Sequence, residues 1–322
     1  ETGISICVDA VIQQTGACIM PSRLFFDIIR KLPDDTVSIS VDEKFKVSIR
    51  GGISSFTITA MSSEDYPELP EVESDKGISL PQNELKAMIG GTSFAVSENQ
   101  ARPIHTGCLF EVEDSSITVV AVDGYRLALR RWKSEEPIGR TLKFVVPAAA
   151  LKEAEKILGD TDEACTFFLG SKHILFTIGE ATLVCRLLEG EFLDWRRVLP
   201  QNQPVKLAVN VAKMTDSIER VGLIISEKLK SPVRCKFGEN TADFRSVSTI
   251  GEAHDVCQIA GDGQDMEIGF NCRYLLDALR AIPDAECSLE LINGLSPIVM
   301  NPCDGSERYS YMVLPVRLKA GE

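Results

Sequence analysis

The segment VVAVDGYRLALRR, residues 119–131, places the dipeptide Asp123-Gly124 between two runs of mainly apolar residues. Asp-Gly readily takes the positive φ values of a two-residue hairpin turn, so this segment predicts two antiparallel strands joined by a tight turn. A second apolar segment, YSYMVLPVRL at residues 309–318, lies near the end of the chain. We expect the two segments to build one small apolar pocket that carries the function.

A local pattern recurs along the chain: a strand, then Pro or Asn, then a short helix with one apolar face. Five copies follow one another at intervals of roughly 60 residues, which marks an internal repeat. Pro suits the first helical turn, where its missing N–H is no loss, and Asn suits a helix N-cap. The five Pro and Asn residues are Pro21, Pro81, Pro147, Asn210 and Asn271, and the expected helices cover residues 23–29, 84–89, 151–158, 214–218 and 274–279.

Short strands fill the intervals between the expected helices. In residues 36–41, 45–49 and 55–59 apolar and polar residues alternate, which is typical of antiparallel sheet with one buried face. One helix and several such strands make up each repeated unit. The predicted fold class is therefore α+β, with repeated helix-plus-antiparallel-sheet units that form three similar domains.

Two segments rich in Pro and acidic residues or amides, at residues 66–73 and 199–204, interrupt the repeat. Segments of this composition commonly connect domains, so we interpret both as linkers. The predicted domains are residues 1–70, 71–200 and 201–322.

Composition is typical of a globular protein in a reducing compartment. The 322 residues are 44% hydrophobic and carry a formal net charge of −13, which argues against binding nucleic acid over a broad basic face. The ten cysteines include no C-x-x-C pair, which favours reduced core cysteines over disulfides or metal ligands. Because the sequence shows no secretory signal and no apolar run of about 18 residues, we expect a cytoplasmic protein with no membrane partner. The chain opens inside a strand, so we expect its natural start to be missing.

Catalytic motifs are absent from the sequence. It contains no G-x-x-x-x-G-K-[ST], H-E-x-x-H or G-x-S-x-G, and His105, His173 and His254 lack the spacing of metal ligands. We expect a protein that is not an enzyme and that uses no cofactor or metal. These observations leave open an acidic, repeat-built interaction scaffold without a role on DNA, and also a hydrolase or transferase with an unfamiliar site.

Four segments carry a resemblance to a known family: YPELP at residues 66–70, RPIHTG at 102–107 with VDGYRLA at 122–128, DWRRVLP at 194–200, and MVLPVRL at 312–318. In these segments, and in their order along the whole chain, the sequence resembles the bacterial β sliding clamps, the processivity subunits of DNA polymerase III. The resemblance implies three domains of two units each and a head-to-tail dimeric ring around duplex DNA. Six units are then expected, whereas five and the strands of a sixth are found, which implies a truncated or disordered start.

The resemblance also implies a pocket for short peptides rich in Leu and Phe, carried by polymerase subunits, the clamp loader and repair proteins. Aliphatic walls would hold two apolar anchors, and arginines would align peptide carbonyls or acidic groups. From the residues alone, Leu127, Val198 and Leu314 also fit an ordinary core, so both interpretations stay open here. The implied pocket residues are His105, Val122, Gly124, Tyr125, Arg126, Leu127, Leu193, Arg197, Val198, Leu295, Leu314, Pro315, Val316 and Arg317, with Asn271 and Tyr274 at the rim.

The expected helices carry a small excess of basic residues, while the rest of the chain is strongly acidic. Simple solvated amphipathic helices explain this excess, and so does a ring whose helices line the hole. A ring held on DNA by topology needs only weak attraction to phosphates, without sequence preference. The residues that the resemblance and this charge pattern together place near DNA are Arg23, Lys86, Asn99, Lys213, Arg220, Arg273 and Arg280.

Closure of a ring needs two complementary surfaces. The resemblance places one at Phe56 and Ile58, on an alternating strand of the first domain, and the other at Leu223, Ile224 and Ile225. Edge strands of the two subunits would then pair across the interface. The alternative is that both sets are ordinary core residues.

Overall fold

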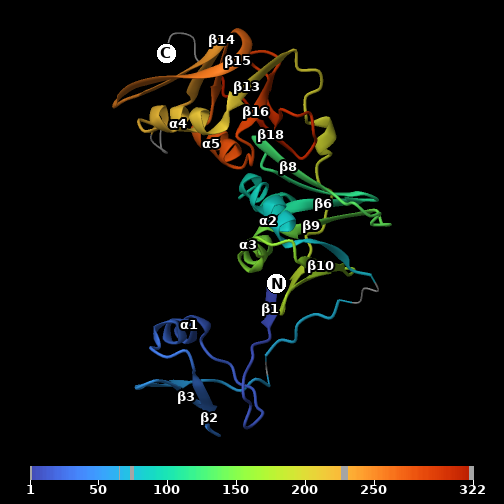
Figure 1. Cartoon of the computed structure of the whole chain (residues 1–322), viewed down its shortest axis with the longest axis vertical. Coiled ribbons are helices and arrows are strands. Elements are labelled where there is room, and N and C mark those ends of the chain that lie inside the picture. Colours follow the sequence, from blue (N-terminus) through green and yellow to red (C-terminus); the bar gives the residue numbers. More distant parts are fainter. Residues whose placement is uncertain (1, 65, 73–75, 226–230, 319–322) are drawn as a thin grey trace. The chain divides into compact units, whose positions relative to one another are not determined.

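The structure is a computed structural model that describes residues 2–64, 66–72, 76–225 and 231–318. The chain divides into two compact units, Cys7–Glu71 as one and Glu1–Ile6 with Val72–Glu322 as the other. Figure 1 shows their helices and strands in the colours of the sequence. No helix within the described residues is both long and apolar enough to cross a membrane.

The unit Cys7–Glu71 consists of one helix and a three-stranded antiparallel sheet. Helix α1 (Ser22–Lys31) begins directly after Pro21, as predicted. The sheet has the order β2-β3-β4, and its strands are β2 (Ser38–Val41), β3 (Lys46–Gly51) and β4 (Ser54–Thr59). Alternate residues of β3, Val47 and Ile49, are fully buried with Ile28 of α1. The predicted alternation is confirmed for this strand.

A five-stranded antiparallel sheet with the order β1-β12-β11-β10-β5 lies in the larger unit. Its strands are β1 (Thr2–Ile6), β5 (Ile78–Pro81), β10 (Ala164–Leu169), β11 (His173–Ile178) and β12 (Ala181–Arg186). Strand β1 pairs with β12, where Thr2 lies opposite Cys185. Strand β1 therefore belongs to a sheet whose other strands lie in the predicted domain 71–200, whereas the predicted boundary places it in the domain 1–70.

A ten-stranded sheet with the order β14-β15-β13-β16-β17-β18-β8-β7-β6-β9 runs through the larger unit. Its strands are β6 (Gly107–Glu113), β7 (Ser116–Val122), β8 (Arg126–Lys133), β9 (Leu142–Pro147), β13 (Val205–Asn210), β14 (Val233–Ser248), β15 (Gly251–Phe270), β16 (Glu286–Leu291), β17 (Ile298–Pro302) and β18 (Tyr309–Val313). Strands β8 and β18 pair with Leu127 opposite Met312. This pairing makes one continuous sheet from the predicted middle and last domains.

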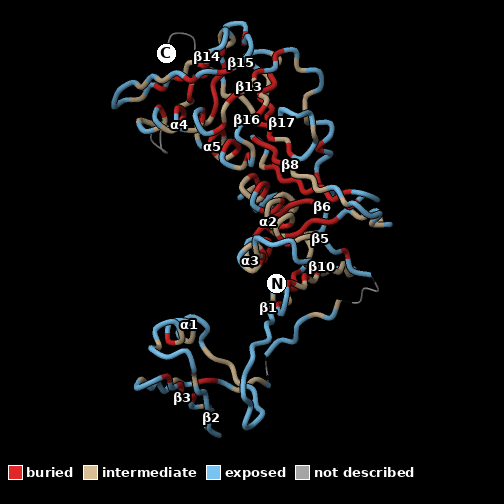
Figure 2. Tube along the Cα trace, in the orientation of Figure 1, coloured by how far each residue is buried: buried red, intermediate tan, exposed pale blue. Residues whose placement is uncertain are grey.

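Four helices accompany these sheets: α2 (Gln82–Gly90), α3 (Ala148–Ile157), α4 (Val211–Gly222) and α5 (Cys272–Arg280). Each begins directly after its predicted Pro or Asn. The side chains of Asn210 and Asn271 accept hydrogen bonds from backbone N–H groups of their own helices, as N-caps do. Helix α2 packs against α3, and α4 against α5. Their apolar faces join the main core, which Figure 2 shows as buried segments along the strands and helices.

The predicted hairpin forms between β7 and β8, but its tip lies one residue later than expected. The N–H of Asp123 donates to the carbonyl of Arg126 at 3.4 Å, which leaves Gly124 and Tyr125 at the tip. Gly124 has a φ of 92°, whereas Asp123 does not have a positive φ. The Asp123 carboxylate instead accepts from the N–H groups of Tyr125 and Arg126. Asp123 therefore caps the turn instead of occupying its tip.

All ten cysteines are free, and those at 108, 165, 185, 235, 257 and 287 are buried. This confirms the interpretation that most of them are core residues. Burial raises the pKa of the Cys108 thiol to about 12, so the thiol stays protonated at neutral pH. The described residues include no group of His, Cys, Asp and Glu side chains that could hold a metal ion.

Candidate functional site

A second apolar cluster lies on the face of the ten-stranded sheet opposite the helices. Successive side chains of a strand point to opposite faces, so on β8 Ala128 joins the main core while Leu127 and Leu129 join this outer cluster. The buried members of the outer cluster are Leu109, Val120, Val122, Leu127, Leu129, Val145, Phe192, Trp195, Val299 and Met312, with Ile104, Leu188, Val198, Leu199 and Leu314 partly buried against them.

The outer cluster brings together four of the residues expected in a pocket: Val122, Leu127, Val198 and Leu314. Val122 and Leu127 are almost fully buried, whereas Val198 and Leu314 are half-buried. The N–H of Leu314 donates to the carbonyl of Tyr125 at 2.8 Å. The chain after β18 is thereby fixed beside the hairpin tip, so the two segments quoted first are neighbours in space.

A hollow of about 480 Å³ lies beside this cluster, where the helical turn η2 (Pro103–Thr106) meets residues 191–194. It holds two further expected residues, His105 and Leu193. The rings of His105 and Phe192 meet edge to face, with centroids 5.2 Å apart. Burial, together with the nearby charge of Arg102, lowers the pKa of His105, so its imidazole is neutral at neutral pH. The lining residues are Arg102, Ile104, His105, Glu191, Phe192, Leu193 and Asp194.

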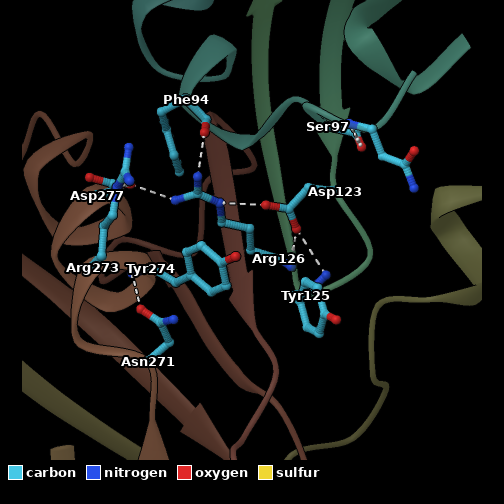
Figure 3. Close-up of polar contacts among 10 residues, drawn as sticks. Phe94, Ser97, Asp123, Tyr125, Arg126, Asn271, Arg273, Tyr274 and Asp277 are labelled. Atoms are coloured by element: carbon cyan, nitrogen blue, oxygen red, sulfur yellow. Dashed lines mark hydrogen bonds and ion pairs between the residues drawn. The ribbon is translucent and has the colours of Figure 1, made fainter. Parts of the chain in front are cut away.

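Arg126 is the centre of a polar junction that Figure 3 shows in close-up. Its Nε donates to Asp123 Oδ2 at 2.9 Å, its Nη1 to Asp277 Oδ2 at 2.6 Å, and its Nη2 to the Phe94 carbonyl at 2.6 Å. The guanidinium also lies over the ring of Tyr274, 4.4 Å from the centroid. Arg126 was expected to align a peptide. In the structure each of its nitrogens donates to a protein oxygen and the residue is buried, so these contacts hold the hairpin to α5 and to the Phe94 carbonyl.

The remaining expected residues surround this junction or lie apart from it. Tyr125 is exposed at the hairpin tip and stacks on Tyr274, with centroids 6.0 Å apart. Asn271 caps α5 through the N–H of Tyr274. Arg197 is exposed and pairs with Asp194 at 3.0 Å, while Leu295 is exposed outside the outer cluster. The tail residues follow Leu314: Pro315, Val316, whose N–H donates to the Gly269 carbonyl at 2.8 Å, and the exposed Arg317.

Glu111 of β6 forms a second polar junction, on the face that carries the outer cluster. Its carboxylate accepts from Trp195 Nε1 at 3.1 Å and Arg196 Nη1 at 2.7 Å, and pairs with Lys143 Nζ at 3.2 Å. Sequence reasoning missed this residue. Its only signal was a carboxylate between the apolar residues Phe110 and Val112 of β6, which does not reveal its partners far along the chain.

The comparisons with known proteins cover almost the whole chain. It matches the DNA polymerase III beta subunit in three parts: the N-terminal domain over residues 1–70, the central domain over 79–194 and the C-terminal domain over 196–317. The chain belongs to this family. Its fold is the sliding clamp fold with three domains, so the resemblance carried by the four sequence segments is confirmed.

Relatives and solved structures agree with this assignment. The Beta sliding clamp of Staphylococcus aureus (strain Mu50) is 32% identical over 310 residues, which cover 95% of this chain and 81% of the relative. A beta subunit structure from Eubacterium rectale aligns with a TM-score of 0.91 at 32% identity, covering 98% of this chain and 85% of that chain. The Bacillus subtilis sliding clamp aligns with a TM-score of 0.88 at 31% identity, covering 96% and 82%.

Most of the helix cations expected near DNA are paired with acidic residues in this family member. Lys86 pairs with Asp160 at 2.9 Å and Arg280 with Glu219 at 2.7 Å. Arg220 pairs with Asp255, and Arg273 lies 3.9 Å from Asp277. The helices therefore present a weaker positive field than their basic residues alone suggest. Arg23 lies on α1, Lys213 on α4, and Asn99 in a turn before η2.

The residues expected at a subunit interface lie on the edge strand β4 and directly after helix α4. Strand β4, which carries Phe56 and Ile58, is an edge strand, and Phe56 is partly exposed. Leu223 follows α4 directly and is 82% exposed, so it is not a core residue. Ile224 is half-buried and Ile225 packs partly against the main core. In the larger unit, β14 is an edge strand, at one end of the ten-stranded sheet.

Proposed function

We propose that this chain is a DNA sliding clamp that encircles duplex DNA and tethers the replicative polymerase to it. Its family is that of a non-catalytic processivity subunit, so polymerisation belongs to its partner. The observation that carries the proposal is the outer cluster at the β8–β18 pairing, where Val122, Leu127 and Leu314 pack together. We expect the protein to act in the bacterial cytoplasm, because duplex DNA is its proposed partner.

The pocket would take short peptides rich in Leu and Phe from polymerase subunits, the clamp loader and repair proteins. Its centre would be Leu127, Val198 and Leu314, and the hollow at His105 and Leu193 would extend it. Burial of two apolar anchors contributes about 3–6 kcal/mol before ordering costs, which supports micromolar affinity. Tethering of a partner on the same DNA raises its effective concentration and tightens the complex. A solved relative supports a ligand site, since a sliding clamp from Pseudomonas aeruginosa is bound to griselimycin.

DNA would be held by topology and by weak contacts from the helices. Arg23, Lys213 and Asn99 would meet phosphates directly, whereas Lys86, Arg220, Arg273 and Arg280 would first exchange their acidic partners for phosphate. Such exchange weakens binding, and weak non-specific binding permits sliding. The ring would close as a head-to-tail homodimer, with the edge strand β4 of one subunit beside β14 of the other and Leu223 against Phe56.

The topological part is tested by loading the protein on nicked circular DNA and then cutting the circle. A clamp stays on the circle and slides off the linear form, which a gel-filtration or pull-down assay measures. Equal retention on both forms would contradict the proposal. The absence of salt-sensitive association with either form would favour an interaction scaffold without a role on DNA.

The pocket is tested by the double substitution Leu127→Ala with Leu314→Ala. We expect it to abolish binding of a fluorescein-labelled peptide that ends in Leu-Phe, measured by anisotropy, without changing DNA retention. Leu151→Ala, in the main core on the other side of the sheet, is the matched control and should keep the peptide affinity. Unchanged affinity in the double variant would remove the pocket assignment.

A further inference from the structure

One wall of the proposed pocket is a segment with little regular structure, residues 191–199. Its buried side chains Phe192 and Trp195 cover the outer cluster, and Val198 packs beside them. Within the segment, backbone hydrogen bonds close the short turn η3 (Trp195–Arg197) on itself: the N–H of Arg197 donates to the Asp194 carbonyl, and those of Val198 and Leu199 donate to the Trp195 carbonyl. These bonds shape the turn but do not attach it to the sheet.

Besides the packing of Trp195 in the outer cluster, η3 is attached to the sheet by polar contacts with β6. Trp195 and Arg196 both donate to the Glu111 carboxylate, and Arg196 reaches Glu113 as well, at 3.3 Å. The Arg196 guanidinium also lies over the Trp195 indole, 4.2 Å from its centroid. Two consecutive side chains of η3 are thereby locked to each other and to one acceptor.

Glu111 is suited to this task because it is buried and ionised. The residue is 7% exposed. Burial opposes its charge, but hydrogen bonds from Arg196, Trp195 and Lys143 outweigh burial and hold the pKa of the carboxyl below its ordinary value. Charge-assisted hydrogen bonds are about twice as strong as neutral ones, so this carboxylate fixes its donors firmly.

We propose that Glu111 is a positioning residue for partner peptides: by anchoring Trp195 and Arg196 it holds residues 191–199 in the position that shapes the hollow beside His105. This inference rests on the proposed pocket and adds a determinant that does not itself touch the peptide. A wall held in place before binding lowers the ordering cost of the complex. Loss of the anchor therefore weakens peptide binding while the apolar contacts remain available.

The test uses Glu111→Gln, which keeps the size of the side chain and an acceptor for Trp195 but removes the charge that holds Arg196 and Lys143. We expect the affinity for the Leu-Phe peptide to fall about tenfold. The chain has two tryptophans, so Trp132→Phe leaves Trp195 as the single reporter of the wall. In that background, Glu111→Gln should shift the Trp195 emission and reduce its response to the peptide. A purely structural role for Glu111 would lower the thermal midpoint without these changes.

Glu290→Gln is the matched control, since Glu290 is a similarly buried glutamate of the same sheet that pairs with Lys206 and not with η3. It should keep the peptide affinity. If Glu111→Gln does not fold, Trp195→Phe removes the donor of the Trp195–Glu111 hydrogen bond instead of its acceptor. The affinity for the peptide should then also fall about tenfold. If the wild type binds the peptide and these variants bind it equally well, the positioning role of Glu111 is overturned while the pocket assignment stands. No peptide binding by the wild type would overturn the pocket and the inference together.

Discussion

Arg126 and Glu111 are two buried charges on opposite faces of one sheet, and the chain satisfies them in different ways. Arg126 gathers acceptors from the hairpin, from the η1 turn (Ser93–Ala95) and from α5, including Asp277, 151 positions along the chain. Glu111 gathers the buried indole N–H of Trp195 and two cations whose side chains are about half exposed, at 48% for Arg196 and 55% for Lys143.

Arg126 joins two domains, whereas Glu111 holds a single segment on the sheet. The partners of Arg126 are themselves mostly buried, at 11% for the Asp123 side chain and 22% for Asp277, and they belong to the predicted middle and last domains. Loss of Arg126 would leave Asp123 without its cation, and Asp277 with Arg273 alone at 3.9 Å, where the two domains share a sheet. Loss of Glu111 would release one covering segment, because Arg196 and Lys143 can turn to water and only the Trp195 N–H would lose a buried acceptor. A buried charge is thus global or local in effect according to where its partners lie.

The largest expected effect comes from Arg126→Ala. Removal of one member of a buried ion pair typically costs about 3–5 kcal/mol, and we expect a loss of this size in the free energy of unfolding measured with urea. Arg126→Lys should recover little, because one ammonium group cannot reach three acceptors in the geometry of a guanidinium. Arg308→Ala, at an exposed ion pair, is the control and should cost less than about 1 kcal/mol. A cost this small for Arg126→Ala would contradict the junction.

A smaller effect, and one that depends on pH, is expected for Glu111→Gln. At neutral pH it should lower the free energy of unfolding by about 1–3 kcal/mol, because charged hydrogen bonds are lost while the Trp195 N–H keeps an acceptor. The folded pKa of Glu111 lies below that of the unfolded chain, so its contribution is complete above about pH 4.5 and fades as pH falls through the folded pKa. Unfolding curves of both proteins should converge in acid. A difference that stays constant down to pH 2 would show that the charge of Glu111 does not stabilise the fold.

The smallest effect is expected at the hairpin tip, with Gly124→Ala. An added Cβ would meet nothing within 4 Å, so the cost comes from the φ of 92° alone and should be about 1 kcal/mol. Gly16→Ala, which also has open space but no left-handed φ, should be neutral or slightly stabilising. A loss comparable with that of Arg126→Ala would mean that the tip, and not the guanidinium, controls the junction.

Local signals predicted the elements well because they depend on residues close in sequence. The helix starts at Pro81 and Asn271 were correct, since capping and the fixed φ of proline act within one turn. The tip of the β7–β8 hairpin was one residue off, because the Asp123 side chain caps the turn in place of occupying it. The pairing of β1 with β12 was not predicted, since its partners are far apart in the sequence.

By itself the sequence determined the repeated α+β units, the family, and the two apolar segments that meet at the candidate pocket. Only the tertiary structure decided which side of the sheet each residue serves. Arg126 and Leu127 are adjacent in the chain, yet one joins a polar junction beside α5 and the other an apolar cluster on the opposite face. Strand pairing fixes which side chains face each side of the sheet, and a shift of the pairing register by one residue would exchange the two faces. For the same reason the role of Glu111 became visible only when folding placed Trp195 and Arg196 above it.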